Sequence, residues 1–184
     1  MRTAVSFLIG CVLGATAILM WVEESGARAV SPADVVPVAA GSRSLHLPVE
    51  GIRIEALRSD FHEPRSGGRR HEAIDILAPR GTPVLAVADG TIRKLFTSKA
   101  GGLTVYHYDD AETTCYYYAH LDRYAENVRE GMTVARGAVI GYVGTTGNAP
   151  KNAPHLHFAI LRLTATKEWW KGEPVDPYPL LTGR

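Results

Sequence analysis

The chain has 184 residues, of which 46% are hydrophobic and 21% are charged, and its formal net charge is +1. This composition is typical of one globular domain with a modest additional segment. Because the Lys and Arg residues are scattered along the chain rather than gathered into a stripe, we expect no nucleic acid partner.

An uncharged apolar run opens the sequence. Residues 4–22 contain no charged residue, Arg2 precedes them, and Glu23 and Glu24 follow. A run of this length can span the hydrocarbon core of a bilayer. The basic residue before it and the acidic residues after it favour a cytoplasmic N-terminus and an exported remainder. We therefore expect residues 1–22 to form a transmembrane helix that anchors the protein in the inner or cytoplasmic membrane.

Two processed alternatives remain open for this run. It can be a cleavable signal segment, with small residues at 15–17 or 27–29, or a lipidated one, with a lipobox-like Leu-Ile-Gly-Cys at residues 8–11. Each alternative places the remaining chain in the cell envelope, on the outer (periplasmic or extracellular) side of the membrane. Residues 23–43 are small and polar with no sustained period, which predicts a flexible linker. Residues 44–184 are the expected domain.

The rest of the sequence has the pattern of an all-β domain. Short apolar runs are separated by Gly, Pro and Asp at intervals of roughly ten residues, which predicts a mainly antiparallel β-sheet. We expect no helix longer than two turns, with at most one helical turn between residues 124 and 134. The expected strands span residues 53–57, 73–77, 83–88, 90–95, 103–108, 114–120, 139–143 and 156–161.

Two short groups of residues suggest a metal site. His155 and His157 lie two residues apart in an expected strand, so their side chains share one face, with α-carbons about 6.6 Å apart. One of them can bind a metal ion while the other lies beside it, and the spacing does not decide which. His71 and Asp75 would be about 13 Å apart in an extended chain, so the chain must bend between them if both bind one ion.

The residue types in these groups point to zinc. Two imidazoles and a carboxylate give the three N or O ligands that catalytic zinc favours, with a fourth position for water. Such a water has a lowered pKa and can attack a peptide carbonyl, and His120 and His155 are available to assist it. A single histidine is more often structural or exposed, but the groups together favour one zinc ion per chain.

A rival interpretation reads the first group as a helix. His71 and Glu72 would then begin a zincin helix, with Asp75 in the place of the second histidine of the HExxH motif. The β-branched Ile74 and Ile76 favour a strand at this position. The helical interpretation therefore conflicts with the local sequence.

Longer segments around these residues carry a resemblance to a known family. The segments are residues 68–76, 78–84, 88–90, 118–121, 141–147, 154–158 and 175–177. From about residue 47 to residue 180 the chain resembles the lysostaphin-type (LytM-domain) zinc metallopeptidases. The resemblance implies a small antiparallel β domain with a loop-walled active-site groove, and cleavage of peptide bonds in peptidoglycan stem peptides or cross-bridges. It also implies that His71, Asp75 and His157 bind the zinc ion, while His120 and His155 assist at the bound water and the transition state.

Two departures from the family pattern concern the groove. Ala73 stands where the family usually has Gly, and its methyl group would narrow the groove or restrict the backbone. Residues 148–153 are irregular before the last His pair. We expect specificity to depend on the groove-wall loops at residues 94–102 and 148–154.

Three functions follow from these observations. The first is a zinc metalloendopeptidase that hydrolyses peptidoglycan cross-links. The main alternative is a non-catalytic LytM-type module that binds the cell wall and activates another wall hydrolase; such modules typically lack several ligands, and this chain lacks none. A scaffold protein with incidental histidines is the third. The sequence does not determine the bond that is cut or the oligomeric state.

Overall fold

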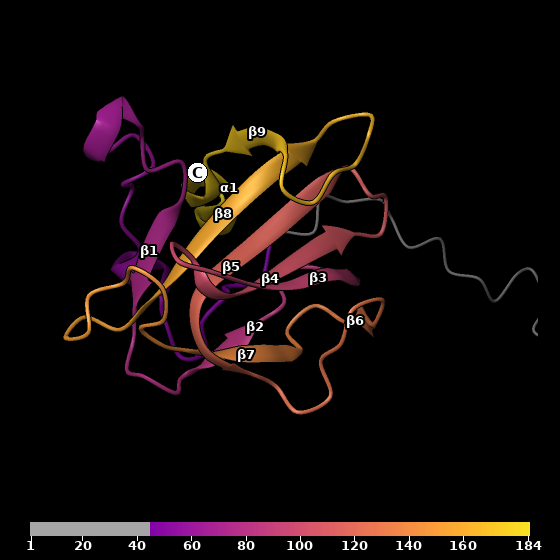
Figure 1. The fold of residues 1–184 in the computed structure, drawn as a ribbon, viewed down its shortest axis with the longest axis horizontal. Coiled ribbons are helices and arrows are strands. Elements are labelled where there is room, and N and C mark those ends of the chain that lie inside the picture. Colours follow the sequence, from indigo (N-terminus) through magenta and orange to yellow (C-terminus); the bar gives the residue numbers. More distant parts are fainter. Residues whose placement is uncertain (1–44) are drawn as a thin grey trace, which may run out of the picture. The chain divides into compact units, whose positions relative to one another are not determined.

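The computed structural model describes residues 45–184 (Figure 1). Among these residues, no helix is long and apolar enough to cross a membrane. The expected transmembrane helix at residues 1–22 and the expected linker at residues 23–43 lie outside the described residues. Both therefore stay predictions.

Nine strands form the described part of the chain. They are β1 (Ile74–Leu77), β2 (Pro83–Leu85), β3 (Gly90–Ser98), β4 (Gly102–Asp109), β5 (Thr114–Tyr124), β6 (Thr133–Val134), β7 (Val139–Val143), β8 (His155–Leu163) and β9 (Gly172–Val175). All their pairings are antiparallel, in the order β1-β8-β5-β4-β3-β6, with β9 also on β8. β7 pairs with β2 and with the end of β5, so these short strands lie together below the longer ones in Figure 1. The expected antiparallel β fold is confirmed.

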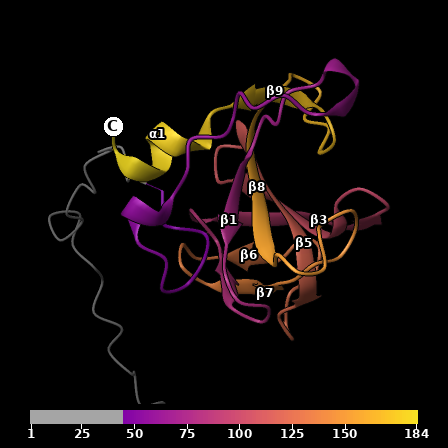
Figure 2. The same cartoon turned by 90° about the vertical axis from the view of Figure 1, so that its left-hand side faces the viewer.

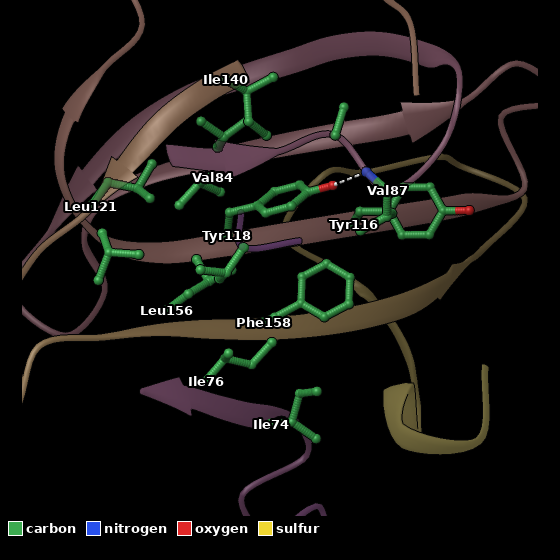
Figure 3. Packing of buried hydrophobic residues seen from close by; sticks show 14 of the residues in the cluster. Ile74, Ile76, Val84, Val87, Tyr116, Tyr118, Leu121, Ile140, Leu156 and Phe158 are labelled. Atoms are coloured by element: carbon green, nitrogen blue, oxygen red, sulfur yellow. Dashed lines mark hydrogen bonds between the residues drawn. The ribbon is translucent and has the colours of Figure 1, made fainter. Parts of the chain in front are cut away.

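The side chains of three adjacent strands, β1, β8 and β5, point alternately into the core and to a second face of the sheet. Ile74 and Ile76 of β1, Leu156 and Phe158 of β8, and Tyr118 of β5 are all buried and pack together (Figure 3). Because successive side chains of a strand point to opposite faces, the residues between them lie on the other face of the sheet. That second face carries the polar residues described in the next subsection.

One local expectation is wrong. Residues 53–57 do not form a strand; the structure has a 3-10 helix there, η1 (Ile54–Ala56). Ile54 is exposed, so the apolar residues that suggested a strand are not all packed on a sheet. Residues 124–134 form no helical turn, which agrees with the expectation of at most one: β5 continues to Tyr124, and a turn at Gly131, with φ 79°, leads into β6.

Several short elements were not expected. They are η2 (Ser66–Gly68), β6, β9 and a C-terminal helix, α1 (Pro177–Thr182). The side chain of Asp176 caps this helix by accepting a hydrogen bond of 2.9 Å from the backbone N of Tyr178. Gly183 ends it in the left-handed conformation with φ 69°. A capping Asp before a Pro and a Gly after the last turn are known helix signals, so α1 could have been predicted.

Candidate metal centre

Asp75 and His157 face each other across two neighbouring strands. In the register of β1 and β8, Asp75 is paired with His157. Their neighbours Ile74 and Ile76 point into the core, so Asp75 points to the opposite face of the sheet. Its Oδ1 atom lies 2.9 Å from Nδ1 of His157.

A bend of the chain brings His71 to the same place. His71 lies in the loop before β1, and Glu72 has a positive φ of 55°, which interrupts the extended chain. Backbone hydrogen bonds of 2.9 Å from His71 to Glu63 and from Glu72 to Phe61 hold this bend. The bend that two ligands of one ion require is therefore present. The helix that the zincin interpretation requires is not, because Asp75 belongs to a strand.

Three side-chain atoms converge in this arrangement, and we call them the donor set: Nε2 of His71, Oδ1 of Asp75 and Nδ1 of His157. The three distances between them are 3.0 Å, 2.9 Å and 3.2 Å. Ligand atoms about 2.1 Å from a tetrahedral zinc ion are about 3.4 Å apart, so the spacing suits such an ion after small adjustments. On the far side of its ring, His71 donates Nδ1–H to the backbone oxygen of Asp60 at 3.2 Å, so its Nε2 atom faces the donor set.

The electrostatics of the donor set favour a cation. Burial by itself lowers the pKa of His71, but hydrogen bonds with Asp60 and Asp75 outweigh it and raise this pKa to about 9. Burial likewise opposes ionisation of Asp75, yet hydrogen bonds with His157 and His71 hold its pKa far below the ordinary range. The surroundings thus stabilise positive charge among these groups. A divalent metal ion with N and O ligands fits both the charge and the donor types.

His120 and His155 lie beside the donor set. The ring of His120 is 4.9 Å from that of His155 and 5.6 Å from that of His157, measured between centroids. Each ring donates Nδ1–H to a backbone oxygen at 2.9 Å, His120 to Thr146 and His155 to Ala153. In a neutral ring held in this way the lone pair is on Nε2. Nε2 of His155 is 3.8 Å from Oδ1 of Asp75, so His157 rather than His155 belongs to the tight group.

The position of His120 depends on a break in strand alternation. Ala119 is paired with His157 in the register of β5 and β8, so regular alternation would turn His120 towards the core face. Instead His120 has a positive φ of 61°, and its backbone N donates to Gly101 at 2.8 Å. Burial, followed by the nearby His157, lowers the pKa of His120 to about 4. The ring is therefore neutral at pH 7.

The donor set lies in a groove of about 670 Å³ with three walls. Two walls come from the loops that were expected, at residues 100–101 and at residues 148–153. Figure 2 shows these loops together beside β8, where the backbone N of Asn148 donates to Ala100 at 3.0 Å. The third wall is the segment before β1, at residues 58–70, which was not expected. Its only signal in the sequence is a concentration of charged residues without a strand or helix period.

Ring-bearing residues of β4 and β5 divide between groove and core, and Ala73 lies away from the groove. Tyr117 lines the groove, whereas its neighbours Tyr116 and Tyr118 are buried on the core side. His107 is fully buried in β4 and does not line the groove. Ala73 is also fully buried and absent from the groove lining, so its methyl group does not narrow the groove.

Comparison with known proteins gives one family match. The model described as Peptidase family M23 matches residues 69–177. The L-Ala–D-Glu endopeptidase of Bacillus subtilis (strain 168) is 36% identical over 149 residues, which cover 77% of this chain and 43% of that protein. The match thus spans less than half of the length of this relative.

Two solved structures support the same match. The catalytic domain of lysostaphin from Staphylococcus simulans is 32% identical with a TM-score of 0.55, covering 64% of this chain and 84% of that chain. A zinc-containing peptidase from Vibrio cholerae is 25% identical with a TM-score of 0.56, covering 74% of this chain and 40% of that chain.

Proposed function

The chain belongs to peptidase family M23, and from this premise we propose that it is a zinc metalloendopeptidase hydrolysing peptide cross-links of bacterial peptidoglycan. Its relatives include an L-Ala–D-Glu endopeptidase and lysostaphin, an antimicrobial peptidase. The observation that carries the proposal is the donor set, in which three potential ligand atoms, two from residues 71–75 and one from His157, lie within 4.8 Å of one another. The alternative of a non-catalytic module has no such support, because no ligand or helper residue is missing.

We assign metal binding to His71, Asp75 and His157. Two neutral imidazoles and one carboxylate would hold one zinc ion, which suits the three-ligand composition of catalytic zinc sites. When bound, the ion supplies Lewis-acid chemistry, polarising a carbonyl group and lowering the pKa of a water molecule.

We assign the proton-transfer role to His120 and His155. Their Nδ1–H groups are held by backbone carbonyls, so each ring is fixed with its Nε2 lone pair available. A ring in this state can take a proton from the attacking water and return it to the leaving amine. Once protonated, it can also donate a hydrogen bond to the negative oxygen that develops on the scissile carbonyl.

We also propose the location of this chemistry. Residues 1–22 would anchor the chain in the membrane, residues 23–43 would act as a tether, and residues 44–184 would form the peptidase domain. The uncharged run at residues 4–22 supports this order. The substrate lies in the cell envelope, so the domain would be on the outer side of the membrane.

The test combines metal content with product release. The purified chain is incubated with peptidoglycan beside the variants His157→Ala and Asp75→Asn. His46→Ala is the control, because the side chain of His46 bonds to the backbone oxygen of Leu47 and does not line the groove. We expect one zinc ion per chain and release of muropeptides from the wild type and the control. Removing a ligand should abolish release and most of the zinc binding. Full activity in His157→Ala would refute the ligand assignment.

A further inference from the structure

One wall of the groove is rich in arginine. The side chains of Arg58, Arg65, Arg69 and Arg70 all line it, and all four come from the segment before β1. We call these four side chains the arginine wall. The lining residues at 100–101 and 148–153 on the other walls are uncharged. The groove is therefore electrostatically asymmetric about the donor set.

The acidic residues that line the groove offset only part of this charge. Asp75 bonds to the histidines of the donor set, and Asp60 lies against His71, with Oδ1 3.5 Å from Nδ1. These carboxylates thus face the donor set. Glu63 is the remaining acidic residue among the groove-lining residues.

Three side chains of the arginine wall, those of Arg58, Arg65 and Arg70, keep donors available to a ligand. Arg65 pairs with Oδ2 of Asp75 at 3.1 Å, but its side chain stays 40% exposed. Arg70 contacts the ring of His62 at 3.3 Å rather than a carboxylate. Within residues 45–184, Arg58 has no ion-pair partner, and it is exposed. Guanidinium groups match carboxylates in geometry and bind them through paired hydrogen bonds.

We propose that the arginine wall selects acidic peptides, in which a residue next to the scissile bond carries a free carboxylate. This inference rests on the proposed function and narrows its substrate class. A stem peptide with free carboxylates fits the arginine wall, whereas an uncharged bridge of glycines offers it no partner. The pairing of Arg65 with Asp75 places the cationic surface directly beside the donor set, so the selected carboxylate lies close to the reacting bond.

The test uses matched peptides and matched variants. Two synthetic cross-linked stem peptides are compared, identical except that one has free carboxylates and the other has them amidated. The double variant Arg58→Gln/Arg70→Gln leaves Arg65 in place and so spares its contact with Asp75. The control is Arg129→Gln, which makes the same chemical change at an exposed residue outside the groove. Equal zinc content and melting temperature establish that the variants are folded.

Both catalysis and binding are measured. kcat/KM is determined with the zinc-loaded full chain, and dissociation constants are determined in a His120→Ala background that suppresses turnover. We expect the wild type and Arg129→Gln to favour the free-acid peptide about tenfold, and the double variant to lose this preference to within about twofold. Raising the ionic strength should weaken binding of the free-acid peptide alone.

The outcomes separate the inference from the proposed function. Equal cleavage and equal binding of the two peptides by the wild type would refute the inference and leave the peptidase assignment standing. Tighter binding of the free acid without cleavage of either peptide would support the inference and refute the peptidase assignment. An unchanged preference in the double variant, or no binding of either peptide, would also refute the inference.

Discussion

At the scale of single residues, His120 and His155 share one arrangement, a ring fixed through Nδ1 with its Nε2 free. We expect His120→Ala to keep its zinc and to lower kcat about 10²- to 10⁴-fold, the usual size of a general acid–base contribution. Zinc content by mass spectrometry and the rate of peptide hydrolysis check this. The same result is expected for His155→Ala. A total loss of zinc in His120→Ala would contradict the prediction and would indicate that His120 is a zinc ligand.

A second residue-scale prediction concerns His107 and acid stability. His107 is fully buried, and burial lowers its pKa from 6.5 to about 4, although Asp109 and Asp89 partly oppose this. Above pH 6.5 the ring is neutral in both the folded and the unfolded chain, so it contributes no pH dependence. Between pH 6.5 and pH 4, His107 is protonated in the unfolded chain but stays neutral in the folded chain. At pH 5 the unfolding free energy should therefore be about 2 kcal/mol lower than at neutral pH.

Urea unfolding from pH 7.5 to pH 5, with chelator present throughout, measures this cost. His107→Gln removes the titrating group, so its unfolding free energy should fall less steeply than that of the wild type. Both proteins share every other ionisable group, and the difference between their slopes isolates His107. Parallel curves would contradict the assignment.

At the scale of elements, the two loops beside β8 are joined at a place where a side chain does not fit. Gly147 has φ 71°, and a Cβ atom there would lie 2.3 Å from the backbone oxygen of Ala100 and 2.3 Å from the backbone N of Gly102. The adjacent Thr146 supplies the carbonyl group that holds the ring of His120. Close contact of these loops therefore positions a proposed proton-transfer residue.

We expect Gly147→Ala to lower the unfolding free energy by more than about 2 kcal/mol and to reduce activity. The matched control is Gly131→Ala, because Gly131 has a similar φ of 79° but no atom within 4 Å of an added Cβ. The control should lose only about 1 kcal/mol of unfolding free energy, from the strain of a left-handed backbone conformation, and should keep its activity. Thermal and urea unfolding with parallel rate measurements compare them. Equal losses of stability and activity in the two variants would show that the contact between the loops accommodates an added Cβ atom.

At the scale of the whole molecule, the hydrophobic core of the described residues, 45–184, lies in the proposed peptidase domain. The core cluster extends from Val49 to Leu181 and draws on all the long strands. We expect residues 44–184 to fold alone, bind one zinc ion and release muropeptides. In fractionated cells, the full chain should be found with the membrane, whereas residues 44–184 exported by a separate signal should be soluble. A soluble full chain would contradict the proposed anchor.

The sequence alone predicts the features that depend on local chemistry and period. Alternation in β1 and β8 separates Ile74 and Leu156 from Asp75 and His157, and this alternation is a property of any strand. The His-x-His spacing likewise places two imidazoles on one face before any partner strand is known. For these reasons most of the strands, and the side of the sheet on which Asp75 and His157 lie, could be predicted.

Only the tertiary structure decides the features that depend on pairing between distant segments. The register that sets Asp75 opposite His157 joins strands far apart in the sequence, and it brings His157 rather than His155 to the donor set. The positive φ of His120 depends on its contact with Gly101. Residues 58–70 have no period to predict their path, so only folding reveals that their arginines line the groove. Spacing along a chain constrains neighbouring side chains, but the position of a distant segment depends on the packing of the whole sheet.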